Sequence, residues 1–181
     1  MRTFIAIPLS PSAITALLSA QESWRLHFEK KLLKASWSRE ESFHLTLKFL
    51  GEVGEEKIEA IQSAMREAGR EFPSFELKLE KAGSFPSVHR PRVLMVSIES
   101  ESLSRLAAKL DEQLELLGFP REKRRFNGHV TLARVREDVR LDEVFLPAVE
   151  PISWQAKELI LFKSELSPQG SKYERLFEME F

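Results

Sequence analysis

The sequence contains the four-residue pattern His-x-Thr-Leu twice, once beginning at His44 and once at His129. In each copy polar and apolar residues alternate, which is the period of a β-strand, where residues i and i+2 share a face. Each copy is therefore predicted to be a strand that presents a histidine and a threonine on one face and Leu or Val on the other. Two such strands facing each other would place two imidazoles and two hydroxyls around one space.

The chain around the motifs repeats in its order of predicted elements. Residues 2–9 and 92–98 are predicted strands, and a helix with an apolar stripe follows each of them. The motif strand comes next in both halves, and a further helix and strand are predicted after it. This order indicates a twofold internal repeat, with halves at approximately 1–85 and 90–181 of a single bilobal domain, 1–181.

The repeat predicts an α+β fold. An antiparallel sheet that is covered by helices on one face leaves its other face open. We therefore expect two pseudo-symmetric lobes, each an antiparallel sheet backed by helices, with a central cleft that carries one His-x-Thr-Leu strand per lobe. Other expected elements are helices over 11–30, 54–68, 101–117 and 141–145, strands over 33–37, 75–79, 152–166 and 173–181, a turn-rich loop over 83–91 and a turn at 168–170.

Composition excludes several classes of site and partner. The chain has no cysteine, which excludes disulfides and thiolate metal sites and favours a reducing compartment, so we expect a cytoplasmic protein. We find neither a signal-peptide pattern nor a stretch as long as a membrane span, and we expect a monomer without membrane association. The formal net charge is −1, so an anionic ligand must be bound by a local patch rather than by bulk charge.

Two histidines and two threonines at one place allow paired acid–base chemistry on a phosphate. Imidazole accepts a proton when neutral and donates one when charged, and both forms are accessible near pH 7. The hydroxyls of Thr46 and Thr131 can donate hydrogen bonds to the oxygens of a tetrahedral anion. Arg134 offers a fixed positive charge to the same oxygens. This set indicates a phosphodiester site that needs neither a metal nor a cofactor.

Other interpretations of these residues are weaker. A catalytic zinc usually needs a third protein ligand, and threonine rather than a carboxylate fills the i+2 position of both motifs. A single motif would favour structural histidines and ordinary strand threonines, but two copies on matching strands favour function. The basic run at 121–125 is interpreted as a solvated face rather than as a guide for RNA.

The paired motifs resemble those of the two-histidine (2H) phosphoesterase superfamily. Within it, the chain is similar to the RNA 2′,3′-cyclic phosphodiesterases, historically called 2′-5′ RNA ligases. The similarity extends over the whole length, and one difference is Gly128, where relatives often have Pro. The residues that carry the similarity are Phe4–Ile7, Trp37, residues 44–53, Phe85-Pro86, Arg90–Arg92, residues 129–134, Ser164, Leu166, Gly170 and Tyr173.

This resemblance implies a reaction and a role for each candidate residue. The family hydrolyses a terminal 2′,3′-cyclic phosphate to a 2′-phosphomonoester, in principle reversibly as a 2′-5′ ligation. By similarity, His44 is expected to donate a proton to the leaving oxygen and His129 to accept one from water. Thr46, Thr131 and Arg134 are expected to hold the phosphate. The implied partners are RNA with a cyclic phosphate end, tRNA fragments among them, or nucleotides.

Phe49 occupies the position in the first motif that corresponds to Arg134 in the second. By the family resemblance, its ring is expected to stack on a nucleobase. Strict alternation places both residues on the face opposite the histidines, unless the strand twists, bulges or ends near that point. Stacking and burial in the core therefore stay open for Phe49. A buried, unpaired arginine would be costly, which favours the phosphate role for Arg134.

Two further functions stay open. One is the same chemistry on a small substrate, such as a cyclic nucleotide or ADP-ribose cyclic phosphate. The other is a non-catalytic module that binds nucleotides or RNA, although the presence of both histidines and both threonines argues against it.

Overall fold

The computed structural model describes residues 1–140, 145–167 and 170–181. The helix expected over 141–145 and the turn expected at 168–170 fall mostly outside these residues. The elements are β1 (Arg2–Ile7), α1 (Pro11–Lys30), β2 (Ala35–Trp37), η1 (Glu40–Ser42), β3 (Leu45–Glu52), η2 (Glu55–Lys57), α2 (Ile58–Gly69), β4 (Phe75–Pro86), β5 (Pro91–Glu99), α3 (Glu101–Glu115), β6 (His129–Val135), β7 (Ser153–Ala156), β8 (Glu158–Ser167) and β9 (Gly170–Glu180).

Local sequence signals explain where the long helices begin. Helix α1 starts at Pro11, whose fixed φ suits the first helical position, and the Ser10 hydroxyl accepts a hydrogen bond from the Ala13 amide at 3.2 Å. Helix α3 is capped in the same way by Ser100, whose hydroxyl accepts from the Leu103 amide at 3.4 Å. Each cap satisfies an amide that has no partner within its helix.

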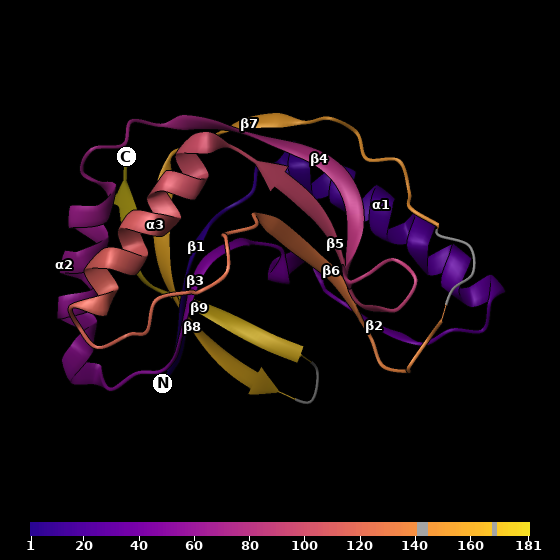
Figure 1. The fold of residues 1–181 in the computed structure, drawn as a ribbon, viewed down its shortest axis with the longest axis horizontal. Coiled ribbons are helices and arrows are strands. Elements are labelled where there is room, and N and C mark those ends of the chain that lie inside the picture. The colour runs from indigo at the N-terminus through magenta and orange to yellow at the C-terminus, as the bar shows by residue number, and fades with distance from the viewer. Residues whose placement is uncertain (141–144, 168–169) are drawn as a thin grey trace.

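The strands form two antiparallel sheets, which confirms the predicted α+β, two-lobe architecture (Figure 1). The first sheet has the order β3-β1-β8-β9 and the second the order β2-β6-β5-β4-β7. Each motif strand therefore pairs with the opening strand of its own half, β3 with β1 and β6 with β5. Strands β8 and β9 complete the first sheet, whereas β2 and β4 join the second, so each sheet contains strands from both sequence halves.

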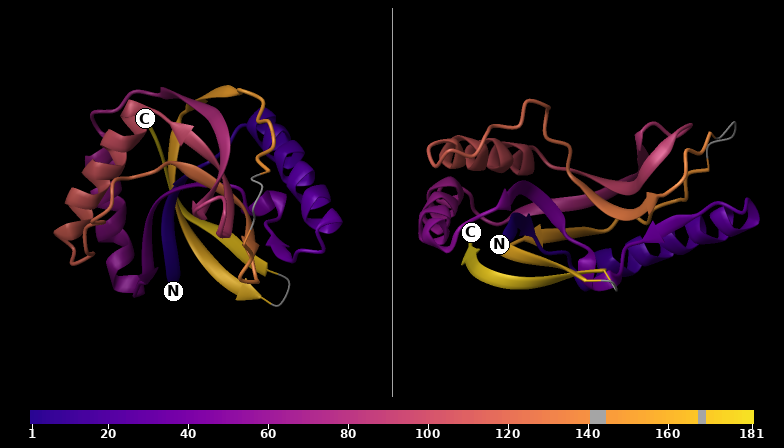
Figure 2. Two further views of the ribbon diagram at one scale, coloured as in Figure 1. Left: turned by 45° about the vertical axis from the view of Figure 1, so that its right-hand side comes forward. Right: turned by 90° about the horizontal axis from the view of Figure 1, so that it is seen from below.

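The helices lie at two ends of the molecule. Both views of Figure 2 show α2 and α3 side by side at one end and α1 at the other. Helix α1 is fixed to β6 by Gln21, whose side-chain amide donates to the Leu132 carbonyl at 2.8 Å. One cluster of buried apolar side chains includes residues from both sheets and all three helices, so the lobes share a hydrophobic core. Among the described residues, no helix is long and apolar enough to cross a membrane.

Two expected boundaries were wrong. Strand β4 continues to Pro86, although Gly83, Ser84 and Pro86 predict a loop, because pairing with β5 extends as far as Pro91 and overrides the local preference. The long tail strand expected over 152–166 is interrupted at Lys157. It forms β7 in the second sheet and β8 in the first.

Candidate active site

The structure confirms the two-faced character of both motif strands. His44 and Thr46 are partly exposed, whereas Leu45 is buried between them. The second motif has the same pattern, with Val130 buried between His129 and Thr131. The buried residues of both motifs belong to the shared core. Burial of the apolar face therefore orients each His-Thr pair toward the opposite face.

The two motif strands approach each other although they lie far apart in the sequence. Cα atoms of β3 come within 8 Å of Cα atoms of β6. This brings both motifs into one region of the molecule. The central cleft between them stays a prediction.

A bulge in β6 places Arg134 on the face of the histidine. Thr131 pairs with Met95 and Ala133 with Leu94, so Leu132 is an extra residue on its strand. Both Leu132 and Ala133 are buried, after which Arg134 returns to the face of Thr131 and is exposed. Among the described residues, no acidic side chain forms an ion pair with Arg134. Its guanidinium is therefore open to an anionic ligand.

A second bulge occurs at the equivalent position of β3. Thr46 pairs with Ala6 and Lys48 with Ile5, so Leu47 is the extra residue. The bulge returns Phe49 to the face of Thr46, where its side chain is 63% exposed and its ring centroid lies 5.9 Å from that of Phe4. The placement of Phe49 and Arg134 opposite the histidines, which strict alternation predicts, is therefore wrong. The exposure of Phe49 also disfavours the core interpretation.

Aromatic rings enclose His44. The ring of Phe4 stacks on the imidazole at a centroid distance of 4.6 Å, and Tyr173 meets it edge-on at 5.0 Å. Phe162 lies at 6.3 Å. Burial by these rings lowers the pKa of His44 to about 4, because the charged imidazolium loses its hydration; a hydrogen bond to the Ser42 backbone opposes this in part. His44 is therefore neutral near pH 7 in the unliganded protein.

His129 has a different environment but a similar anchor. Its Nδ1 lies 2.8 Å from the Asn127 carbonyl oxygen. A carbonyl oxygen only accepts hydrogen bonds, so Nδ1 carries a proton and Nε2 of the neutral ring has a free lone pair. In both motifs the imidazole thus bonds to the backbone two residues upstream. The aromatic neighbour of His129 is Phe85, edge-on at 5.9 Å.

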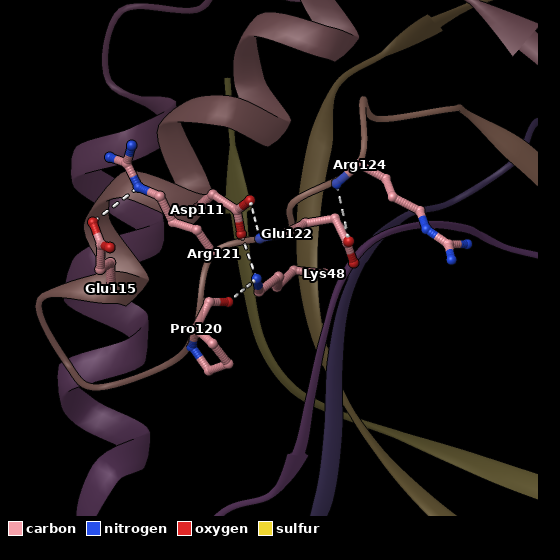
Figure 3. A network of polar contacts seen from close by, with 7 residues as sticks. All are labelled: Lys48, Asp111, Glu115, Pro120, Arg121, Glu122 and Arg124. Carbon is pink, nitrogen blue, oxygen red and sulfur yellow. Dashed lines mark hydrogen bonds and ion pairs between the residues drawn. The ribbon is translucent and has the colours of Figure 1, made fainter.

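A polar network connects β3 to the segment that leads into β6 (Figure 3). Lys48 forms an ion pair with Asp111 of α3 and donates to the Pro120 carbonyl at 2.7 Å. The second oxygen of Asp111 accepts from the Glu122 amide at 3.0 Å. The side chains of Lys48 and Asp111 are only 12% and 17% exposed. We call residues 116–128 the connector, and Lys48 thus ties the first motif strand to the chain that enters the second.

Gly128, the last residue of the connector, lies directly before the second motif and packs closely against β5 and α3. A Cβ at this position would lie 2.6 Å from the Ile98 carbonyl oxygen and 2.8 Å from a methyl group of Leu103. The Ile98 amide donates to the Gly128 carbonyl at 2.8 Å. The absence of a side chain therefore lets the chain pass close to β5 as it enters β6.

The sequence motifs identified the histidines, the threonines, Arg134 and Phe49, but not the residues around them. Phe4, Phe85 and Tyr173 are among the residues that carry the family resemblance, but no role beside the histidines was predicted for them. The positions of Phe4, Phe162 and Phe85 beside the histidines depend on strand pairing. In the described part of the chain, no group of three or more His, Asp or Glu side chains is placed to hold a metal ion.

Comparison with known proteins identifies relatives over the whole chain. The family model for LigT-like phosphoesterases matches residues 9–95 and again 96–173, so each match contains one motif. The RNA 2′,3′-cyclic phosphodiesterase of Thermotoga maritima is 33% identical, covering all of this chain and 96% of that protein.

Solved structures share the fold. The crystal structure of TT0787 from Thermus thermophilus superposes with a TM-score of 0.86 at 29% identity, covering 99% of this chain and 97% of that one. The E. coli LigT structure in complex with 3′-AMP gives a TM-score of 0.75 at 27% identity, with the same coverage of both chains.

Proposed function

Because the chain belongs to the LigT-like phosphoesterase family, we propose that it is an RNA 2′,3′-cyclic phosphodiesterase. It would hydrolyse the cyclic phosphate at an RNA end to a 2′-phosphomonoester and a free 3′-hydroxyl. The observation that carries this proposal is the approach of β3 and β6. His44, directly before β3, and Thr46 lie on the non-core face of one strand, and His129 and Thr131 lie on the non-core face of the other. The curated names of the relatives support the same activity.

The proposed base is His129. Water attacks phosphorus while the bond from phosphorus to the 3′-oxygen breaks, so one group must take a proton from water. The hydrogen bond from Nδ1 to the Asn127 carbonyl supports this role, because it leaves the Nε2 lone pair available and fixes the plane of the ring.

The proposed acid is His44, which would give its proton to the departing 3′-oxygen. An acid must be protonated before the step, yet burial holds His44 neutral in the unliganded protein near pH 7. An opposite charge within a few ångströms favours the charged form of an imidazole. The substrate phosphate would therefore raise the pKa of His44 and protonate the acid only in the complex.

Three side chains would hold the phosphate. Thr46 and Thr131 share faces with the histidines and can donate hydrogen bonds to the non-bridging oxygens. The exposed guanidinium of Arg134 lies on the face of Thr131 and would supply positive charge as negative charge develops. Phe49 would stack on the base of the terminal nucleotide. No step in this scheme requires a metal ion or a cofactor.

The substrate is proposed to be RNA that ends in a 2′,3′-cyclic phosphate, tRNA fragments included. The same scheme allows ligation, because a 5′-hydroxyl could take the place of water as the nucleophile and form a 2′-5′ linkage. Attack of the 3′-hydroxyl on that linkage, with loss of the 5′-oxygen, is the reverse of this step. We also propose a cytoplasmic location and a monomeric state, neither of which the chemistry requires.

Replacement of each histidine by alanine tests the proposal. With EDTA present, the wild-type protein should open a cyclic-phosphate-ended RNA. His44→Ala and His129→Ala should each lower kcat by about 100-fold or more, since each removes a proton-transfer group. Circular dichroism should show that both variants are folded. Activity that needs added metal, or that survives in both folded variants, would contradict the proposal.

A further inference from the structure

Phe85 is an exposed aromatic residue beside the second histidine. It lies near the end of β4, its side chain is 40% exposed, and its ring meets the His129 imidazole at 62°. Phe85 pairs with Val93, which in turn pairs with Arg134. Paired residues of antiparallel strands share a face, so Phe85 lies on the same face as the histidine and the arginine.

The two sheets contain corresponding rows of residues across this face. In the first sheet, Phe49 pairs with Phe4, and Phe4 pairs with Phe162. In the second sheet, the equivalent row is Arg134, Val93 and Phe85, because β6, β5 and β4 take the places of β3, β1 and β8. Phe85 therefore corresponds to Phe162.

The two corresponding phenylalanines differ in what covers them. Phe162 contacts Phe4 and also Tyr173, which β9 contributes. Within the described residues, the ring of Phe85 has one aromatic neighbour, His129. The next strand, β7, pairs with β4 only over Phe75–Lys78 and ends well before Phe85. The open ring face of Phe85 is thus available to a ligand.

We propose that Phe85 is a second nucleobase-stacking residue, which with Phe49 gives the site two nucleoside subsites, one beside each histidine. This inference rests on the proposed function. Aromatic side chains stack on any base, because every base has a π-face. Phe49 is the exposed phenylalanine on the His44 side of the site, and Phe85 is the exposed phenylalanine on the His129 side.

The chemistry assigns the second subsite to a nucleoside with a 5′-oxygen. In an in-line displacement the entering and leaving oxygens lie on opposite sides of phosphorus. Both ester oxygens of the cyclic phosphate belong to one ribose, so the position opposite the 3′-oxygen belongs to water or to a 5′-hydroxyl. When a 2′-5′ linkage is cleaved, the 3′-hydroxyl gives its proton to one histidine and bonds to phosphorus. The bond to the 5′-oxygen breaks, and that oxygen receives a proton from the other histidine.

The test compares two substrates that share the first nucleoside. One is adenosine 2′,3′-cyclic phosphate and the other is 2′-5′-linked diadenosine. In Phe85→Ala, the ratio of kcat/KM for the dinucleotide to kcat/KM for the cyclic nucleotide should fall roughly five- to a hundredfold, mostly through KM, because one stacking contact is lost. Phe85→Trp should restore the ratio, and Phe85→Leu, which keeps apolar bulk without a π-face, should not.

Leu26→Ala on α1 is a matched control, since it removes an exposed apolar side chain that belongs to neither motif sheet. It should leave the ratio unchanged. An unchanged ratio in folded Phe85→Ala would overturn the inference. So would a wild-type protein that opens the cyclic nucleotide but cannot cleave the dinucleotide. If the wild-type protein opens the cyclic phosphate of neither the nucleotide nor an RNA end, the proposed function itself is refuted.

Discussion

The two histidines have the same place in their motifs but different surroundings. His44 lies among Phe4, Phe162 and Tyr173, whereas His129 is anchored by Asn127 and has one aromatic neighbour among the described residues. The alternating pattern predicted which face each imidazole occupies. It could not predict the rings around His44, because they come from three separate strands that only the tertiary pairing brings together.

The low pKa of His44 should make stability depend on pH. The folded pKa is about 4 and an unfolded histidine titrates near 6.5. Between these values the unfolded state binds more protons, so the free energy of unfolding falls as the pH is lowered through this window. Relative to His44→Asn, the wild-type protein should lose on the order of 2–3 kcal/mol between pH 7 and pH 4. Urea unfolding of both proteins at the two pH values measures this difference.

Carboxylates that titrate in the same range are present in both proteins, so they cancel in the comparison. A difference between wild type and His44→Asn that is the same at pH 7 and pH 4 would show that burial does not depress the pKa of His44.

At the scale of elements, two bulges decide which residues reach the site. Each occurs at the leucine of its motif, Leu47 in β3 and Leu132 in β6. No glycine marks either position, so the sequence carries no local bulge signal. The pairing with β1 and β5 creates them instead. This explains why strict alternation predicted the histidines and threonines correctly but misplaced Phe49 and Arg134.

The bulge in β3 has a second consequence, because it places Lys48 where it reaches Asp111. Lys48→Met keeps the apolar stem but leaves a largely buried carboxylate without its cation. We expect a loss of about 2 kcal/mol in the free energy of unfolding, between the values typical of surface and buried pairs. We also expect a lower kcat, because the connector leads into the strand of His129. Urea unfolding and single-substrate kinetics measure the two effects.

Lys109→Met is the matched control, since Lys109 forms an exposed ion pair with Glu112 on the same helix as Asp111. It should change stability by no more than about 0.5 kcal/mol. Adding Asp111→Asn to Lys48→Met should recover part of the lost stability, because no unpaired charge then remains. Equal effects of Lys48→Met and Lys109→Met would show that the network contributes no more than a surface pair.

At the scale of the whole molecule, the internal repeat predicted two sheets but not their membership. Hydrophobic periodicity indicates which face of a strand is buried, not which strand lies beside it. The exchange of β2, β4 and β8–β9 between the sheets was therefore not predictable from the pattern. Strand β8 contributes Phe162 and β9 contributes Tyr173 to the surroundings of His44. The first histidine thus depends on the last strands of the chain.

The most direct test of the proposed activity is end-group analysis of the product formed from an RNA with a 2′,3′-cyclic phosphate end, in the presence of EDTA. The resemblance to the RNA 2′,3′-cyclic phosphodiesterases leads us to expect opening of the ring at the 3′-oxygen, with the two histidines as the proton-transfer groups. The product should carry a 2′-phosphate and a free 3′-hydroxyl, with one oxygen from solvent when the reaction is run in ¹⁸O-labelled water. A 3′-phosphate product, or no product without added metal, would contradict the account.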